Sequence, residues 1–349
     1  MSDGTLEHDV DQVLARAGNV WEEFRGASIF ITGGTGFFGH WLLETFAGAN
    51  ARFDLNARAV VLSRDPKKFL ERNPGLASNP AIAFHLGDVR RFDYPEGSFS
   101  HIIHAATPAS AALNDQHPLE MLEIIAGGTR RVLDFAQHSH ARKLLLCSSG
   151  AVYGRQPPDM PHIAESYMGA PDPLDPRSAY GEGKRIAELM CTTVSHQTGI
   201  EMKIARCFAF LGPHLPLDAH FAAGNFLRDA LAARPIVIHG DGTPVRSYLY
   251  AADLMVWLWT ILARGEAGRA YNAGSEAAID IAHLAQRIVE IVAPGTPIEI
   301  RTQPIAGRTP ERYVPSTLRA RSELQLDEYT DLSEAIRRTA AWHRLRRSP

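Results

Sequence analysis

A tyrosine and a lysine that could move a proton stand four residues apart in SAYGEGKRIAE, residues 178–188. On a helix, Tyr180 and Lys184 would share one face. A free phenol titrates at about pH 10, and a neighbouring ammonium favours its phenolate, so this tyrosine could exchange protons near neutrality. Upstream, the apolar run LLLCSS ends in Ser148 and Ser149. Hydroxyls at a strand end face the crevice where parallel sheets bind ligands. We expect the Ser148 hydroxyl only to cap the local backbone.

A glycine-rich turn, ITGGTGFFGHWL, places Gly33, Gly36 and Gly39 three residues apart between an apolar run and a helical stretch. In a dinucleotide-binding turn the first glycine permits the bend, the second lets the backbone approach the pyrophosphate, and the third lets helix and strand pack. Because the triplet follows a strand and opens a helix, the sequence predicts a bound nicotinamide dinucleotide.

The second strand ends in VVLSRDP, where an NAD-specific protein would usually offer an acidic side chain to the ribose. Ser63 and Arg64 stand there, and a guanidinium can pair with a 2′-phosphate. The sequence therefore favours NADP(H), while Asp65 leaves NAD(H) possible. Asp88, in HLGDV, is expected to accept from the adenine amino group or to cap a turn.

Alternating strands and helices must position these residues. Apolar runs at SIFITGG, RAVVLS, IAFHLGDV, HIIHAA, KLLLCSS and EMKIARCFAF alternate with helical stretches, which predicts a parallel sheet with right-handed crossovers. We predict an α/β fold, a Rossmann-like doubly wound parallel sheet with a smaller C-terminal substrate-binding lobe. The expected divisions are a helical extension over 1–26, a dinucleotide-binding domain over 27–211, and a lobe over 212–349 whose residues 250–273 pack back on that domain.

Composition excludes several other classes. The 349 residues are 45 % hydrophobic, and a net charge of −3 without long like-charge blocks disfavours nucleic acid as a partner. No stretch reads as a signal peptide or a membrane span, so we expect a cytoplasmic protein. Cys147, Cys191 and Cys207 show no metal or disulfide spacing, and no metal is expected. His104, His214 and His220 are lone histidines, which we do not count as catalytic.

Taken together, TGGTGFFG, SSGAVYG, YGEGK, GDGTPVRSYLY and YNAGS resemble the extended short-chain dehydrogenase/reductase superfamily, in its NAD-dependent epimerase/dehydratase, nucleotide-sugar-modifying branch. The resemblance implies that Tyr180 is the catalytic acid/base, that Lys184 lowers its pKa and holds the nicotinamide ribose, and that Ser149 hydrogen-bonds the reacting oxygen. The cofactor-binding residues it implies are Gly33, Thr35, Gly36, Phe37, Phe38, Gly39, Ser63, Arg64, Asp88, Val89, Ala105, Ala106, Thr107, Tyr180 and Lys184.

The second lobe is expected to hold a nucleotide-diphosphate sugar. By the resemblance, Arg246 grips the diphosphate, Asn225 contacts the diphosphate or base, and Arg308 is either a second diphosphate contact or a solvated surface residue. RCFAFLGP departs from the family, because Ala209 and Leu211 replace an asparagine and a tyrosine. The implied substrate-binding residues are Thr107, Ser149, Gly150, Ala151, Asn225, Arg246 and Arg308.

Gly150 and Ala151 limit the reactions that this chain could catalyse. In 4,6-dehydratases of the branch an Asp-Glu pair follows the serine or threonine, and in its sugar-acid decarboxylases a glutamate does. Neither residue here can transfer a proton, which leaves redox at one carbon. We expect an NADP(H)-preferring reductase of a nucleotide-linked 4-keto-6-deoxy sugar. A redox-neutral NAD-dependent epimerase and a non-catalytic dinucleotide sensor are the alternatives. The resemblance also implies a homodimer through the helices over 118–138 and 178–198.

Overall fold

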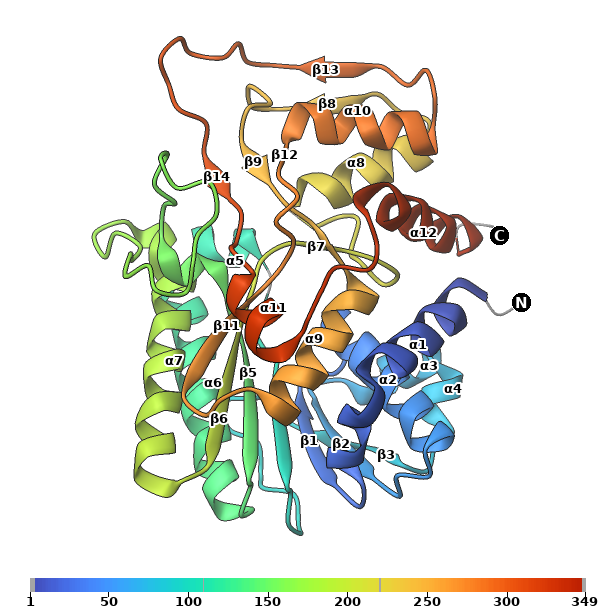
Figure 1. Ribbon diagram of the computed structural model, residues 1–349, viewed down its shortest axis with the longest axis vertical. Helices are drawn as coiled ribbons and strands as arrows, with labels where there is room; N and C mark the ends of the chain where they lie inside the picture. The colour runs from blue at the N-terminus through green and yellow to red at the C-terminus, as the bar shows by residue number, and fades with distance from the viewer. Residues whose placement is uncertain (1–3, 109, 220, 347–349) are drawn as a thin grey trace.

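Seven parallel strands form the central sheet of the computed structural model, which describes residues 4–108, 110–219 and 221–346 (Figure 1). The strand order is β11-β6-β5-β4-β1-β2-β3. The strands are β1 (Ser28–Thr32), β2 (Arg58–Ser63), β3 (Ile82–Leu86), β4 (His101–His104), β5 (Lys143–Ser149), β6 (Glu201–Cys207) and β11 (Arg269–Ala273).

The direction of winding reverses between β1 and β4. From β1 the chain adds β2 and β3 on one side, then returns to place β4, β5 and β6 on the other. Thr32 of β1 is in register with His104 of β4, so the turn after β1 and the segment after β4 meet at one edge of the sheet. Ligands of open α/β sheets bind at such a switch point.

Helices cover both faces of this sheet, which is why its strands are apolar on both sides. Alternate residues of β1 show the two faces: Ile29 and Ile31 join a core with Trp259, whereas Phe30 joins a core with Phe135. The covering helices are α1 (Gly4–Ala17), α2 (Phe37–Arg52), α6 (Pro118–His138), α7 (Ala179–Thr198) and α9 (Ala251–Arg264).

Short elements complete the chain. The remaining helices are η1 (Gly18–Phe24), α3 (Pro66–Arg72), α4 (Pro74–Ala77), α5 (Ala111–Gln116), η2 (Gly150–Tyr153), η3 (Pro176–Ser178), α8 (Ala222–Leu231), α10 (Ile281–Val292), α11 (Leu318–Leu324) and α12 (Leu332–Leu345). The remaining strands are β7 (Phe210–Leu211), β8 (Ile236–Ile238), β9 (Val245–Arg246), β10 (Leu249–Tyr250), β12 (Ile279–Asp280), β13 (Ile298–Ile300) and β14 (Arg312–Tyr313).

The smaller C-terminal lobe contains α8, α10 and α12 and three small sheets, of which β12-β9-β14 bears on the site. Its helices share one continuous core with α1, α2 and α9. Asp9 of α1 accepts from Tyr250 and pairs with Arg338 of α12, both at 2.5 Å, so the first and last helices lie together (Figure 1). The predicted α/β fold with a parallel sheet and a smaller C-terminal lobe is confirmed.

Candidate active site

Ser149 and Tyr180 meet where β5 ends and α7 begins. The Ser149 Oγ accepts from the Ala151 amide at 3.1 Å and caps η2, and it lies close enough to the Tyr180 phenol to oppose part of the rise in the pKa of Tyr180. The start of α7 is fixed by Asn114 of α5, whose Oδ1 accepts from the Tyr180 amide at 2.9 Å. Sequence reasoning did not find Asn114.

Lys184 is buried one helical turn further on. Its Nζ donates to Thr107 Oγ1 and to the Cys147 carbonyl, each at 2.8 Å, and lies 5.9 Å from the centre of the Tyr180 ring. Burial lowers the pKa of Lys184 and raises the pKa of Tyr180, a shift that the bond from Ser149 opposes. Burial is the largest cause, so the pKa of Tyr180 is raised overall in this structure. That Lys184 lowers the pKa of Tyr180 stays a prediction.

Tyr313 of β14 completes this group, and sequence reasoning missed it. Its phenolic oxygen lies 3.4 Å from Ser149 Oγ, and its ring packs on Phe208 with centroids 4.6 Å apart. Tyr313 pairs with Arg246 across β9 and β14. We call Ser149, Tyr180, Lys184 and Tyr313 the catalytic corner.

Gly150 leaves no room for a side chain beside this corner. A Cβ at this position would lie 2.6 Å from Phe208 Cζ and 2.7 Å from the Tyr313 phenolic oxygen. The absence of an acid at position 150 is therefore a property of the packing as well as of the sequence.

The glycine-rich turn fits a dinucleotide. Gly33 has a φ of +75°, and a Cβ there would lie 2.6 Å from the Ala105 carbonyl carbon. The 16-residue helix α2 begins after Gly36, which has no side chain to cap it. The first amides of α2 are therefore available to a phosphate. Thr35, Phe37, Phe38 and Gly39 belong to the same turn and first helical residues.

Two charged residues follow the end of β2, on the side of the site predicted to hold adenosine: Arg64, which is exposed, and Asp65, which is hydrogen-bonded. Asp65 Oδ1 caps α3 by accepting from the Lys68 amide at 3.1 Å, and Ser63 Oγ accepts from the Asp65 amide at 3.2 Å. Arg64 is exposed. The position where NAD-specific folds offer a carboxylate thus presents a guanidinium.

Asp88 follows β3 and is already partnered. Its two carboxylate oxygens accept from Arg90, both at 2.9 Å, which lowers the pKa of Asp88 to about 2. Val89 is buried against Gly128 of α6, while Ala105, Ala106 and Thr107 follow β4 beside Gly33. The contact of Asp88 with adenine stays a prediction.

The predicted substrate residues are placed less closely together. Arg246 is half-buried, with its guanidinium carbon 6.0 Å from the centre of the Tyr313 ring. The Asn225 amide can donate to the Leu217 and Ala219 carbonyls, at 3.1 and 2.9 Å. Arg308 lies in the exposed stretch 301–311. The structure brings Arg246 to the catalytic corner and shows no contact of Asn225 or Arg308 with it.

Residues 29–274 match the family model described as the NAD dependent epimerase/dehydratase family. The chain belongs to this family. The expected NAD(P)-dependent enzyme of the nucleotide-sugar-modifying branch is thereby confirmed.

Curated relatives include a UDP-glucuronic acid decarboxylase 1 of Arabidopsis thaliana, 29 % identical over 89 % of this chain and 68 % of the relative. The Xenopus tropicalis protein of that name is 31 % identical over 70 % of this chain and 56 % of its own length. Among solved structures, a UDP-glucose 4-epimerase of Thermotoga maritima has a TM-score of 0.75 at 18 % identity, covering 91 % and 99 % of the two chains. RMD of Pseudomonas aeruginosa, complexed with NADPH, has a TM-score of 0.74 at 21 % identity, covering 92 % and 99 %.

A buried polar network lies behind the corner of this family member. Ser148 Oγ donates to Glu188 at 2.5 Å, and Glu188 pairs with Arg206 at 2.7 Å. Arg206 also donates to the Tyr153 phenol at 2.9 Å, and Tyr153 donates to Asn272 Oδ1 at 2.7 Å. Ser148 is therefore a structural residue that ties β5 to α7.

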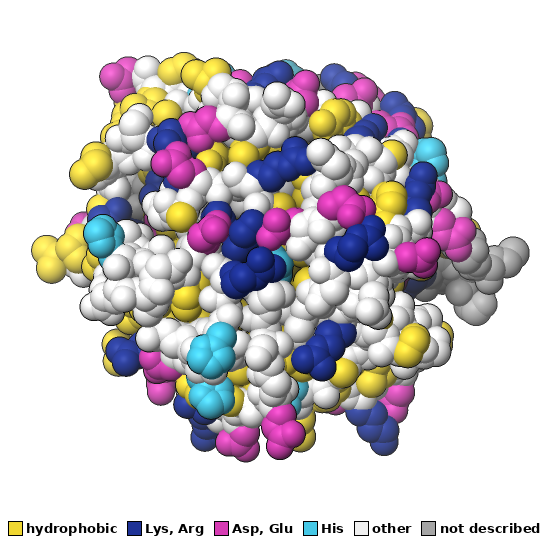
Figure 2. Space-filling model, turned by 60° about the horizontal axis from the view of Figure 1, so that its bottom comes forward, with side chains coloured by type: hydrophobic (Ala, Val, Ile, Leu, Met, Phe, Trp, Pro, Cys, Tyr) yellow, Lys and Arg dark blue, Asp and Glu magenta, His cyan; other side chains and the backbone are white. Residues whose placement is uncertain are grey.

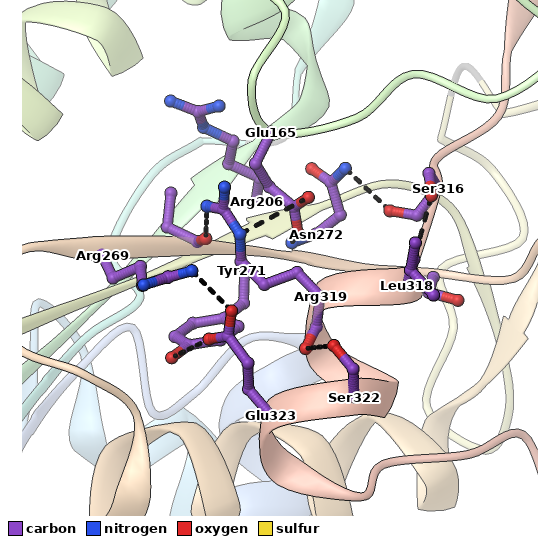
Figure 3. Close-up of polar contacts among 12 residues, drawn as sticks. Glu165, Arg206, Arg269, Tyr271, Asn272, Ser316, Leu318, Arg319, Ser322 and Glu323 are labelled. Carbon is purple, nitrogen blue, oxygen red and sulfur yellow. Dashed lines mark hydrogen bonds and ion pairs between the residues drawn. The ribbon is translucent and has the colours of Figure 1, made fainter.

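Asn272, in the YNAGS motif, extends the network to the strand of Tyr313 (Figure 3). Its side-chain Nδ2 donates to the carbonyls of Ile163 and Ser316, at 2.8 and 3.0 Å, and its backbone N–H donates to Glu165 Oε1 at 2.9 Å. The motif thus fixes the segment just after Tyr313 to the edge strand β11.

The histidines take structural places. His104 Nδ1 and Nε2 are hydrogen-bonded to Thr32 and Thr129 at 2.8 and 3.0 Å, and burial lowers its pKa to about 3. His214 stacks on His40, while His220 lies outside the described residues. All three cysteines are buried and free. Within the described ranges, no group of His, Cys, Asp or Glu is arranged for a metal, and no helix is long and apolar enough to cross a membrane.

Proposed function

We propose that this chain is an NADP(H)-preferring reductase of a nucleotide-linked 4-keto-6-deoxy sugar. The observation that carries the proposal is the filled space above Gly150: Phe208 and Tyr313 occupy the place of any side chain there. The corner holds a hydroxyl, a phenol and an ammonium and lacks an acid after Ser149. Such a group can move one proton at one oxygen.

Some curated relatives are named UDP-glucuronic acid decarboxylase, but we do not propose decarboxylation for this chain. Sugar-acid decarboxylases of the branch carry a glutamate after the serine or threonine, and this chain has Gly150 and Ala151. An identity of 29–31 % leaves ample room for a change of reaction within one family.

Each residue of the corner has a task in carbonyl reduction. The reduced nicotinamide supplies a hydride when it is bound. Ser149 donates to the carbonyl oxygen, and Tyr180 gives its phenolic proton to that oxygen as the C=O bond becomes an alcohol. Burial raises the pKa of Tyr180, so the phenol is protonated at neutral pH. It can still give its proton to the alkoxide formed by hydride transfer, because an alkoxide is the stronger base. Lys184, held by Thr107 and Cys147, positions the ribose and later supports return of a proton.

NADP(H) is preferred in this proposal because Arg64 is exposed at the end of β2 while Asp65 is used to cap α3. A 2′-phosphate would meet a cation there. The fold accommodates both cofactors, since similar solved structures are complexes with NADPH and with NAD.

For the substrate, we propose that Arg246 and Arg308 take the diphosphate, with Asn225 near the diphosphate or base. Phe208, which packs against Gly150, and Ala151 are apolar and suit a methyl group at the sugar carbon beside the ketone, in place of a carboxylate. The division at residues 27–211 and 212–349 remains part of this proposal, as do the cytoplasmic location and the homodimer. Exposed Leu119 on α6 and Leu189 on α7 support a dimer through those helices.

The test is an assay of purified enzyme with a substrate panel. Loss of NADPH absorbance that depends on a dTDP- or GDP-linked 4-keto-6-deoxy sugar is the expected result. Carbon dioxide released from UDP-glucuronic acid would overturn the proposal. Protein that arrives loaded with NAD and interconverts UDP-glucose and UDP-galactose would establish the epimerase instead.

A further inference from the structure

A cavity of about 450 Å³ opens between the end of β2 and the last helix of the chain. One wall contains Thr35, Ser63 and Arg64, which belong to the predicted adenosine site. The facing wall contains Trp342 and Arg346, from the C-terminal end of α12 and the residue after it. We call this space the cation cavity.

Positive charge dominates its lining. Arg64, Lys68 and Arg72 follow one another at intervals of four residues, and Arg346 joins them from the opposite wall. Among the ion pairs of the described residues, none involves these four side chains. Asp65 also lines the cavity, but its Oδ1 is used by the Lys68 amide. Glu44 and Asp88 act on Arg346 and Arg64 only at longer range, without a close ion pair. Cations gathered without close carboxylate partners indicate a site for an anion.

A second observation points to a ligand with acceptor atoms. Trp342 is 6 % exposed, and its indole Nε1 is buried without a hydrogen-bond partner among the described residues. The Arg346 guanidinium carbon lies 4.2 Å from the centre of the Trp342 ring, so the cation and the unpartnered N–H stand on the same wall. Buried N–H groups without partners are rare in native proteins, and a phosphate oxygen would supply the acceptor.

His214 does not add charge to this wall. It stacks on His40 with ring centroids 4.1 Å apart and packs against Trp342 at 4.6 Å. Burial lowers the pKa of His214 to about 2, so both ring contacts are made by a neutral imidazole. The attraction for an anion therefore comes from Arg64, Lys68, Arg72 and Arg346.

We propose that the cation cavity holds the 2′-phosphate of NADP(H), and that Arg346 is a specificity-determining residue that the C-terminal helix contributes to cofactor binding. This inference rests on the proposed preference for NADP(H). The cavity adjoins Ser63, where a dinucleotide fold places the adenosine ribose, and its volume exceeds that of one phosphate. The predicted diphosphate residue Arg246 lies instead on β9 beside Tyr313, so the nucleotide-sugar phosphates are assigned elsewhere.

The experiment compares Arg346→Ala with the wild-type enzyme by fluorescence titration with NADPH, NADH, 2′,5′-ADP and 5′-AMP. We expect Arg346→Ala to lower the affinity for NADPH and for 2′,5′-ADP by about tenfold, as for loss of a hydrogen bond between charged groups. The affinities for NADH and 5′-AMP should not change. Arg337→Ala is the matched control, because Arg337 lies on the same helix, pairs with Glu334 and is absent from the cavity wall. The Lys68→Ala and Arg72→Ala variants should lower the affinity for the same two ligands, NADPH and 2′,5′-ADP.

The outcomes separate the two proposals. If the wild-type enzyme binds NADH as tightly as NADPH, the cofactor preference in the proposed function is wrong, and this inference is wrong with it. If the wild type prefers NADPH and Arg346→Ala keeps that preference, only the assignment of Arg346 is overturned. An equal loss of affinity for all four ligands would also overturn this assignment, because Arg346 would then stabilise the fold of the pocket and would not bind the phosphate.

Discussion

The catalytic corner and the cation cavity differ in how their polar groups are partnered. In the corner, Lys184 donates to Thr107 and Cys147, and Ser149 is bonded to its neighbours in the same protein. In the cavity, Lys68 and Arg346 have no ion-pair partner among the residues that the structure describes. The first region is organised before any ligand arrives, whereas the second is completed by its ligand.

The difference reflects what each region must do. Reaction geometry has to be held within tenths of an ångström, so hydroxyls and ammonium are fixed by buried hydrogen bonds. Affinity for a phosphate needs only accessible positive charge, and exposed side chains provide it at little desolvation cost. Figure 2 shows the more usual surface, where Lys and Arg side chains are interspersed with Asp and Glu.

Replacing Tyr180 by phenylalanine should break the corner and spare the cavity. We expect kcat to fall by about 10²–10⁴, because the proton donor is lost. Titration with NADPH should give an unchanged affinity, since the cation cavity is intact. Full turnover by the variant would remove Tyr180 from its assigned role.

Filling the space at Gly150 should disturb the corner through packing. Gly150→Ala places a Cβ against Phe208 and Tyr313, and we expect a loss of about 1–3 kcal/mol in the free energy of unfolding, together with reduced kcat. Gly127→Ala on α6 is the control, because a Cβ there meets nothing within 4 Å. Urea unfolding should show that the control is stabilised by about 0.5–1 kcal/mol. A stable and fully active Gly150→Ala variant would contradict the filled site.

Acid should destabilise the fold through His104, the last residue of β4. Its pKa is about 3 in the folded protein against 6.5 for the free group, so the unfolded chain takes up the proton first as pH falls. Stability therefore declines below pH 6.5 and continues to decline toward pH 3, by about 1.4 kcal/mol per pH unit for this residue. Urea unfolding at several pH values should show a flatter profile for His104→Gln. An unchanged slope would mean that His104 is not neutral in the fold.

Removing only the Tyr313 hydroxyl should have the smallest effect. Its bond to Ser149 is long, at 3.4 Å, so Tyr313→Phe should lower kcat by about threefold to tenfold without changing stability greatly. Tyr329→Phe, which alters an exposed phenol, serves as the control. If kcat of Tyr313→Phe matches the wild type, the bond to Ser149 does not position the serine.

Local patterns were sufficient to predict much of this molecule. Apolar runs located six of the seven strands of the central sheet, all except β11, and the four-residue interval between Tyr180 and Lys184 located the helix that carries both. These features depend on neighbours in the chain, so the sequence displays them directly.

Residues brought in from distant segments could not be predicted in this way. Tyr313 reaches Ser149 from a two-residue strand that follows an exposed stretch, and no periodic pattern marks it. Arg346 reaches the end of β2 only because α1, α9 and α12 pack together. The raised pKa of Tyr180 was also missed, since burial is a property of the folded chain and the helical spacing alone suggested the opposite.

The crowding above Gly150 also constrains how this reaction could change by descent. A mutation that introduces an acid at position 150 would bring its Cβ against Phe208 and Tyr313. Both aromatic residues would first have to be exchanged for smaller ones, and each exchange alone removes part of a working site. The order of substitutions would thus matter more than their number.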